Sequence, residues 1–195
     1  MLASASPRRV ALLEECGFAP EVEPADVDDA SIRLGSVRAA DAASALAHFK
    51  VRRVEHVRRA RGAEPRWILA ADTVCIRDLE ILGKPGDRLE AAAMIRSFER
   101  RRHGVVTGWC LVAPSGRRWI GRDEASIEFG TIDPAELERF LDLGLWNGKA
   151  GGYNLPEVVS RGWPVRCEGD PQTVVGLPAR RLAPFLRSAL AGEVG

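Results

Sequence analysis

The sequence predicts one α/β domain over residues 1–195, in which helices cover a β-sheet. Short apolar runs alternate along the chain with segments of helical periodicity, and this alternation favours a layered α/β architecture. The length of 195 residues fits a single domain. Hydrophobic residues make up 46% of the chain and charged residues 28%, so the chain can form a core and is too apolar for disorder.

Helices are predicted where a capping residue precedes apolar positions of helical spacing. Ser6 is a natural N-cap with Pro7 in the first turn, and Gly17 is a natural residue to end that helix. Asp87 and Glu90 resemble a capping box. The further predicted helices cover residues 36–61, about 88–102, 133–144, and 178 onward.

Strands are predicted where apolar residues are continuous or alternate. The run from Trp67 to Ala71 predicts a buried strand that ends at Asp72. The segments 74–76 and 80–82 flank a short turn and predict a hairpin. Further strands are expected at 103–112 and around 125–129, with at best a short one at 1–3 and an ordered loop at 147–157.

Charge and cysteine usage restrict the class of protein. Lys and Arg number 28 and Asp and Glu 27, so the net charge of +1 argues against a nucleic-acid-binding or membrane-surface protein. We find neither an apolar run long enough to span a membrane nor a signal-peptide pattern, and expect a cytoplasmic protein. Four cysteines without a CxxC pair predict reduced core residues: Cys16, Cys75, Cys110 and Cys167.

The segment Ser4–Arg9 is the first candidate for chemistry. Arg8 and Arg9 fall in the first turn of the predicted helix, where the positive end of the helix dipole disfavours cations. A bound phosphate would reverse that cost, because free amide groups and two cations would surround it. A solvent-exposed basic turn explains the same residues, and the spacing alone does not decide between the two.

Asp72 and Lys84 are the next candidates, each at the predicted end of a strand. Asp72 could bind a divalent metal or accept a proton from water, or it could simply cap the following turn. Lys84 lies between Gly83 and Pro85 and could contact a phosphate, although a lone lysine is more often only solvated. The segment 144–149 is one residue short of a P-loop and is rejected as one, and His103 is expected to be structural.

Six segments in a fixed order carry a resemblance to the Maf family of nucleotide pyrophosphatases. They are LASASPRR at 2–9, ADT at 71–73, ILGKP at 81–85, HGVVTG at 103–108, KAGGY at 149–153 and VVGLP at 174–178. The resemblance implies an inosine-triphosphatase-like fold with a mixed twisted sheet flanked by helices, in a homodimer. It also implies hydrolysis of a nucleoside triphosphate between the α and β phosphates, assisted by Mg²⁺ or Mn²⁺, to a monophosphate and pyrophosphate.

The resemblance also assigns roles to individual residues. Asp72 would be the proton acceptor or a metal-linked carboxylate, and Asp29, where the family commonly has a glutamate, a second metal residue. The residues that would line the phosphate site are Ser6, Arg8, Arg9, Lys50 and Lys84.

Three positions bear on the choice of base. Arg8 and Thr73 resemble the branch of the family that acts on dTTP and UTP, rather than the branch that acts on 7-methyl-GTP. The third position departs from the family, because Pro156 stands where a glutamine is usual and has no side-chain group to read a base. Asn154 and Glu157 are the candidates to replace that glutamine.

Alternatives of other classes remain open from the sequence. Pro156 and Asp29 would also suit a relative that binds nucleotides without hydrolysing them and regulates cell division, since the family is associated with inhibition of septum formation. A pyrophosphatase for another base, such as 7-methyl-GTP, is a second alternative. The arginine-rich segments 52–59 and 100–102 could bind RNA or DNA, but they carry few interleaved aromatic residues and favour a solvated helix face.

Overall fold

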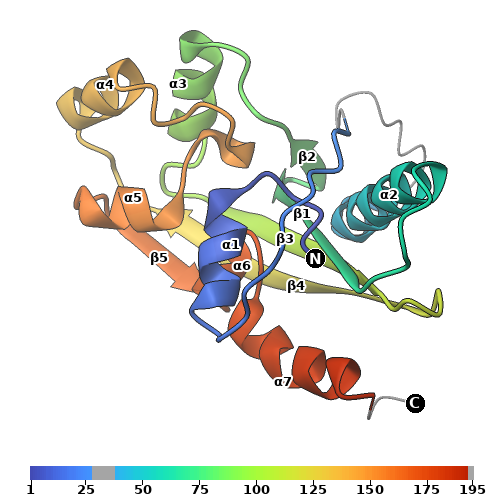
Figure 1. The fold of residues 1–195 in the computed structure, drawn as a ribbon. Coiled ribbons are helices and arrows are strands. Elements are labelled where there is room, and N and C mark those ends of the chain that lie inside the picture. The colour runs from blue at the N-terminus through green and yellow to red at the C-terminus, as the bar shows by residue number, and fades with distance from the viewer. Residues whose placement is uncertain (28–37, 193–195) are drawn as a thin grey trace. The chain divides into compact units, whose positions relative to one another are not determined.

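The computed structural model describes residues 1–27 and 38–192, so the predicted metal residue Asp29 lies outside the described residues. The described helices are α1 (Pro7–Glu14), α2 (Ala39–Ala60), α3 (Arg88–Arg96), α4 (Pro134–Asp142), the 3₁₀ turn η2 (Ala150–Gly152), α5 (Leu155–Ser160), α6 (Pro171–Val175) and α7 (Ala179–Leu190). The strands are β1 (Ile68–Arg77), β2 (Glu80–Leu82), β3 (Arg102–Val112), β4 (Arg118–Phe129) and β5 (Val165–Glu168). The strands form a sheet in the order β2-β1-β3-β4-β5, which confirms the predicted α/β class (Figure 1).

At each edge of the sheet, the outermost strand pairs antiparallel with its neighbour. β1 pairs with β2 as the predicted hairpin, with Cys75 opposite Leu82. β4 pairs with β5, with Phe129 opposite Val165. Parallel pairing is found in isolated bridges, such as that of Leu2 with Leu69.

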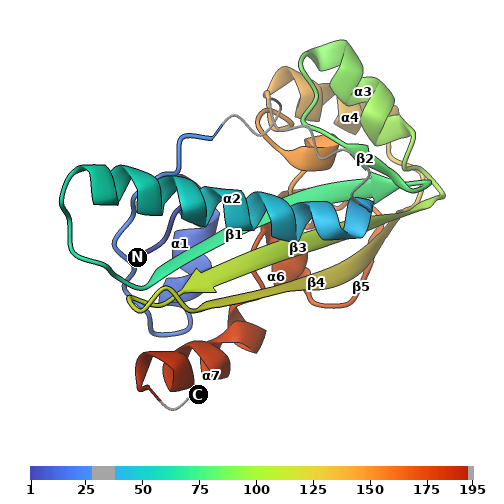
Figure 2. The same ribbon diagram turned by 90° about the vertical axis from the view of Figure 1, so that its right-hand side faces the viewer.

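The chain divides into two compact units, each with its own core. The first comprises Met1–Asp72, Thr107–Asp123 and the residues from Gly176 onward. In it, α2 runs along β1 (Figure 2) and packs its small and branched side chains on one face of the strands. The core on this face consists of Ala3, Ala25, Ala47, Val51, Val54, Ile68, Ala70, Cys110 and Val112.

A glycine determines how closely α2 approaches β3 in the first unit. A Cβ atom at Gly108 would lie 2.1 Å from the backbone nitrogen of Ser44 and 2.3 Å from the carbonyl carbon of Ala43. Backbone atoms at such distances cannot be relieved by a change of rotamer. Residue 108 must therefore lack a side chain for α2 to pack where it does.

The second unit comprises Thr73–Val106 and Glu124–Val175. Within it, α3 contacts both α4 and η2, and α5 contacts α6. Figure 1 shows α3 beside α4. Its core is rich in aromatic rings, with Phe98, Phe129 and Phe140 fully buried. The other buried members include Ile95, Ile127, Leu137, Leu141, Tyr153, Leu155, Val158 and Trp163.

Several predicted element boundaries are wrong. β4 begins at Arg118 rather than near residue 125. β1 continues through Asp72 to Arg77, so the carboxylate lies within a strand and not at its end. α3 ends at Arg96 rather than near 102, because the chain turns and the amide of Arg100 donates to the carbonyl of Phe129 at 2.8 Å. The predicted loop at 147–157 contains η2 and the first residues of α5.

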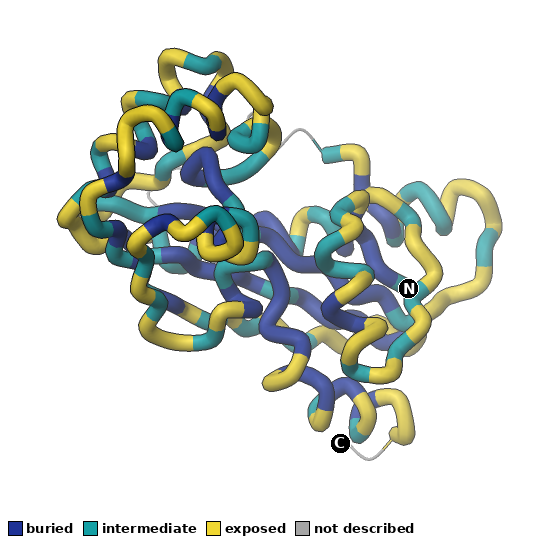
Figure 3. Tube along the Cα trace, turned by 90° about the vertical axis from the view of Figure 1, so that its left-hand side faces the viewer, coloured by how far each residue is buried: buried dark blue, intermediate teal, exposed yellow. Residues whose placement is uncertain are grey.

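The other sequence-based expectations fare better. The four cysteines are free, and Cys75 and Cys110 are buried as predicted, whereas Cys16 and Cys167, also predicted as core residues, are only partly buried. In Figure 3 the buried residues follow the strands, while turns and outer helix faces are exposed. Among the described residues, none of the helices combines the length and the apolar character that crossing a membrane requires.

Candidate functional site

An ion pair joins two of the predicted site residues, Asp72 and Lys50. Asp72 is carried by β1 and Lys50 by α2, and the Lys50 ammonium donates to Asp72 Oδ1. Lys50 can reach the strand because it borders the buried stripe of α2 that includes Ala47 and Val54. The Lys50 side chain is 12% exposed and that of Asp72 10%. Burying a carboxylate this deeply is costly unless it is paired, so the two charges depend on each other.

Arg9 ties the N-terminal segment to the segment before α7. Its Nε donates to the carbonyl of Gly176 at 2.8 Å, and a terminal nitrogen donates to Ser4 Oγ at 3.0 Å. Ser4 Oγ also accepts from the amide of Ser6 at 3.2 Å. The sequence analysis includes Ser4 in the candidate segment but gives it no role, although the Ser-x-Ser spacing before a helix is a known signal for such side-chain-to-backbone turns. Arg9 therefore joins two of the motif segments, 2–9 and 174–178.

Ser6 and Arg8 begin α1. Ser6 is the N-cap residue, but its side chain makes no capping hydrogen bond. The first turn contains no acidic residue, and Arg8 has no ion-pair or hydrogen-bond partner among residues 1–27 and 38–192. The positive end of the α1 dipole thus lies beside the uncompensated charge of Arg8. This is the arrangement from which the sequence predicts a bound anion.

Lys84 belongs to the second unit and follows β2. It is exposed, and within the described parts of the chain its ammonium has no partner. The residues beside it are anchored, because Pro85 is buried and the carbonyl of Gly83 accepts from the amide of Gly151 at 3.1 Å. The Lys84 side chain is therefore solvated, while its backbone lies between the buried Pro85 and the hydrogen-bonded Gly83.

The predicted specificity residues of the second unit lie on β1 and in α5. Thr73 is a half-buried residue of β1. Pro156 is in the first turn of α5, a position that proline tolerates because the amide there needs no partner. Glu157 accepts from the ammonium of Lys149, which also donates to a backbone carbonyl. Asn154 caps α5 without a side-chain capping bond, and its Oδ1 is buried with no partner in the described structure.

Asp72 is the candidate ligand for a divalent cation in the described part of the chain. The described residues contain no group of three or more His, Cys, Asp or Glu that could hold a metal. Mg²⁺ in nucleotide sites is usually bound through one or two carboxylates, with phosphate and water oxygens completing its octahedron. Asp72, a carboxylate fixed on a buried strand, fits that requirement once a polyphosphate supplies the remaining oxygens.

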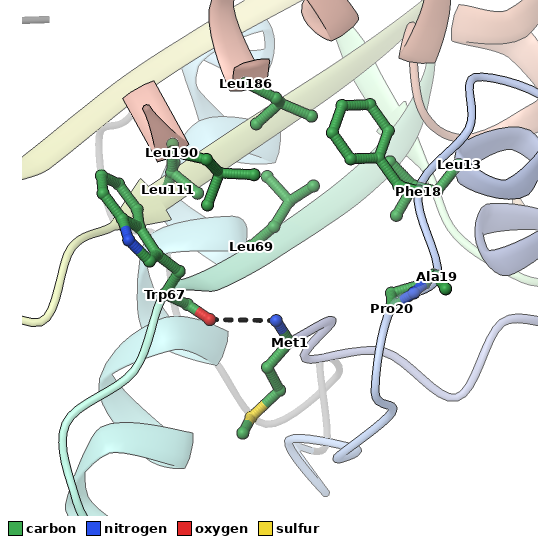
Figure 4. A pocket seen from close by; sticks show the side chains of 10 residues that line it. All are labelled: Met1, Leu13, Phe18, Ala19, Pro20, Trp67, Leu69, Leu111, Leu186 and Leu190. Carbon is green, nitrogen blue, oxygen red and sulfur yellow. Dashed lines mark hydrogen bonds between the residues drawn. The ribbon is translucent and has the colours of Figure 1, made fainter. Parts of the chain in front are cut away.

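A cavity of about 150 Å³ in the first unit contains none of the predicted site residues. Its walls are apolar, and the amine of Met1 donates to the carbonyl of Trp67 at 3.0 Å at its edge (Figure 4). Burial lowers the pKa of that amine. A cavity without a cationic side chain cannot compensate the charge of a nucleotide. The lining residues are Met1, Leu13, Phe18, Ala19, Pro20, Trp67, Leu69, Leu111, Leu186 and Leu190.

Comparisons with known proteins match nearly the whole chain. A family model described as Maf-like protein matches residues 1–189. A dTTP/UTP pyrophosphatase from Salinibacter ruber is 39% identical over 98% of this chain and 91% of its own. Proteins with the same description from Chelativorans sp. and Caulobacter vibrioides are 35% and 36% identical, covering 95% and 91% of this chain and 88% and 89% of their own.

Two solved structures align with nearly the whole chain at low sequence identity. A HAM1 protein from Coxiella burnetii superposes with a TM-score of 0.49 at 14% identity, covering 98% of this chain and 97% of its own. A nucleoside-triphosphatase described as a dITP/XTP pyrophosphatase, from Mycobacterium abscessus, gives a TM-score of 0.44 at 18% identity, covering 100% and 97%.

Proposed function

The chain belongs to the Maf family, and from that premise we propose that it hydrolyses nucleoside triphosphates to nucleoside monophosphates and pyrophosphate. The observation that carries the proposal is the buried ion pair of Asp72 with Lys50. Asp72 lies within the ADT segment and Lys50 on the helix that packs against the same strand. A carboxylate fixed in this way is suited to orient a water molecule for attack on a phosphoryl group.

The cationic residues would compensate the negative charge of the substrate. A triphosphate carries several negative charges, which repel an incoming hydroxide and increase on the departing pyrophosphate. Arg8 and the amide end of α1 are suited to bind phosphate oxygens, and so is the solvated ammonium of Lys84. Arg9 holds the segment that presents Arg8, through its bonds to Gly176 and Ser4.

Asp72 performs the proton chemistry. It orients the attacking water and accepts its proton, while Lys50 keeps the carboxylate in one orientation on β1. A divalent cation, Mg²⁺ or Mn²⁺, would be held by Asp72 together with phosphate oxygens and supplies positive charge that polarises the attacked phosphoryl group. The bond between the α and β phosphates breaks, and pyrophosphate leaves.

The substrate class is a pyrimidine nucleoside triphosphate. Relatives at 35–39% identity are described as dTTP/UTP pyrophosphatases, and Arg8 and Thr73 match the pattern of that branch. Pro156 cannot hydrogen-bond a base, and Glu157 is engaged by Lys149. The carboxamide of Asn154 is therefore the best candidate in this segment to read the edge of a pyrimidine, which presents a donor beside an acceptor.

A pyrophosphate-release assay tests the proposal. Purified protein is incubated with each of dTTP, UTP, CTP, ATP, GTP and 7-methyl-GTP, in the presence of Mg²⁺ or Mn²⁺. We expect stoichiometric monophosphate and pyrophosphate, fastest with dTTP and UTP. Binding of triphosphates without pyrophosphate release would contradict the proposal and identify a non-hydrolysing nucleotide-binding protein instead.

A further inference from the structure

The segment that contains η2 is hydrogen-bonded to the segment that carries Lys84. The amide of Gly151 donates to the carbonyl of Gly83 at 3.1 Å, directly before Lys84 in the sequence. A Cβ atom at Gly152 would lie 3.5 Å from Pro85 Cγ, directly after Lys84. Of the two residues that flank Lys84, Gly83 is thus hydrogen-bonded to η2, and Pro85 lies close to it.

The close approach of η2 depends on backbone conformations that favour glycine. Gly151 and Gly152 both have φ of 75°, in the left-handed region. A Cβ atom at Gly151 would lie 3.1 Å from the Sγ of Cys75, which is tighter than ordinary contact. Glycine adopts this conformation without strain but has no side chain to anchor it, and Tyr153, which directly follows η2, is in a position to do so.

Tyr153 is anchored by His103 inside the aromatic core of the second unit. Its Oη lies 2.7 Å from His103 Nε2, a hydrogen-bond distance. Tyr153 is 6% exposed and His103 3%. The His103 ring stacks on Phe98 with centroids 3.9 Å apart, and the Tyr153 ring meets Phe129 edge-on at 5.0 Å. Both rings are therefore held in place by packing as well as by their hydrogen bond.

The imidazole of His103 is a polar ring inside a core of aromatic side chains. Its Nδ1 is buried and has no partner in the described parts of the chain, which carries an energetic cost. The hydrogen bond between His103 Nε2 and the Tyr153 hydroxyl offsets part of the cost of burying the imidazole. A buried polar pair of this kind specifies one arrangement among several packings of similar energy.

We propose that His103 and Tyr153 are positioning residues that hold η2 and, through the Gly151–Gly83 hydrogen bond, the backbone of Lys84. This inference rests on the proposed role of Lys84 in binding the departing pyrophosphate. Loss of the Tyr153 hydroxyl leaves η2 with alternative positions and moves the Lys84 ammonium. Misplacement by about 1 Å of a group that stabilises a transition state can cost about 100-fold in rate.

The first experiment compares variants of the pair. Tyr153→Phe and His103→Met remove the hydrogen bond, and we expect kcat/KM to fall about tenfold and the Kd of inorganic pyrophosphate to rise by a similar factor. His103→Gln places a polar nitrogen or oxygen near the former Nε2 and is expected to restore activity to within about threefold of the wild type. If Tyr153→Phe does not fold, the comparison of His103→Gln with His103→Met carries the test.

Phe140→Leu is the matched control. Phe140 belongs to the same core and packs on Trp163, with ring centroids 4.9 Å apart. The substitution is expected to lower the Tm but to leave kcat/KM and pyrophosphate affinity unchanged. Equal kinetic losses in Phe140→Leu and Tyr153→Phe would overturn the inference, because any weakening of this core would then suffice.

A double-mutant cycle with Lys84→Ala decides whether the pair acts through Lys84. If it does, Tyr153→Phe combined with Lys84→Ala is no more than about twofold slower than Lys84→Ala alone. Multiplicative losses would overturn the inference while leaving the role of Lys84 intact. An unimpaired Lys84→Ala variant would instead refute the proposed phosphate role of Lys84, and the inference with it.

Discussion

At the scale of the residue, the charge of Asp72 depends on Lys50 for compensation. Sequence reasoning selects Asp72 as a candidate from its expected place at the end of a strand, and that premise is wrong, since Asp72 lies in the middle of β1. The partnership with Lys50 could not be derived from periodicity, because it joins residues 22 positions apart on different elements. Lys50 was predicted as a site residue only through the resemblance to the Maf family.

Asp72→Asn removes the proton acceptor and leaves the Lys50 ammonium without its counter-charge. We expect kcat to fall by about 100-fold or more. The free energy of unfolding should fall by about 1 to 3 kcal/mol, which leaves the fold intact. Pyrophosphate release and urea unfolding measure the two effects. A folded Asp72→Asn variant with near wild-type turnover would show that another group accepts the proton.

Lys84→Ala removes an exposed side chain with no partner in the described structure. We expect the free energy of unfolding to stay within about 0.5 kcal/mol of the wild type. The kcat/KM for dTTP or UTP should fall about 10- to 100-fold, because a charge that stabilises the leaving group is lost. Unchanged kinetics with a large fall in Tm would indicate a purely structural lysine.

His103 gives stability a dependence on pH. Burial lowers its pKa from an ordinary value of 6.5 to about 4. The unfolded chain therefore takes up a proton as the pH falls through 6.5, while the folded protein does so only near 4. The contribution of the neutral His103 to the free energy of unfolding is therefore fully present above pH 6.5. It is lost as the pH falls from 6.5 to 4, to a total of about 3 kcal/mol.

Urea unfolding at pH 7, 5.5 and 4.5 measures this loss. His103→Gln cannot titrate, so its free energy of unfolding should fall less over the same range than that of the wild type. Parallel curves for the two proteins would mean that His103 titrates alike in the folded and unfolded states.

At the scale of the element, capping residues were the most reliable signal. Asp87 accepts from the amide of Glu90 at 2.8 Å and Asp133 from that of Glu136 at 2.9 Å, and α3 and α4 begin there as predicted. Glu90 itself bonds to the amide of Gly86 rather than completing a reciprocal box with Asp87. Helix starts could thus be predicted because their hydrogen bonds are local.

Elements that depend on distant partners were missed. β5 has only four residues with no buried position, so its alternation is weak, and its pairing with β4 comes from far along the chain. The first residues of α5 fall in the glycine-rich segment 147–157 that the sequence predicts as a loop, whereas proline, here Pro156, is favoured in a first helical turn. The end of α3 is likewise decided by a bond from Arg100 to Phe129.

The packing of α2 on β3 can be tested at Gly108. Gly108→Ala places a methyl group on the backbone of Ser44, and we expect a loss of about 3 kcal/mol or more. Gly104→Ala in the same strand is the control, since its Cβ would lie 3.8 Å from that of Ile76, an ordinary contact. Thermal and urea unfolding compare the two variants. Similar losses in both would show that strand propensity, not the approach of α2, is decisive.

At the scale of the whole molecule, each unit has its own apolar core. We expect these cores to fold without a cation, whereas turnover should require one. We expect EDTA to abolish pyrophosphate release and to leave the Tm of the nucleotide-free protein unchanged. Added Mg²⁺ should restore activity. Full turnover in EDTA would refute metal assistance, and a large fall in Tm would reveal a structural metal.

The cysteines offer a practical route to following the molecule in solution. Burial raises the pKa of the Cys75 thiol to about 12 and that of Cys110 to about 11, which makes both inert toward maleimides at neutral pH. Cys16 and Cys167 are partly exposed, and one belongs to each unit. Donor and acceptor dyes on these two positions would let single-molecule energy transfer record any movement between the units when a nucleotide is added.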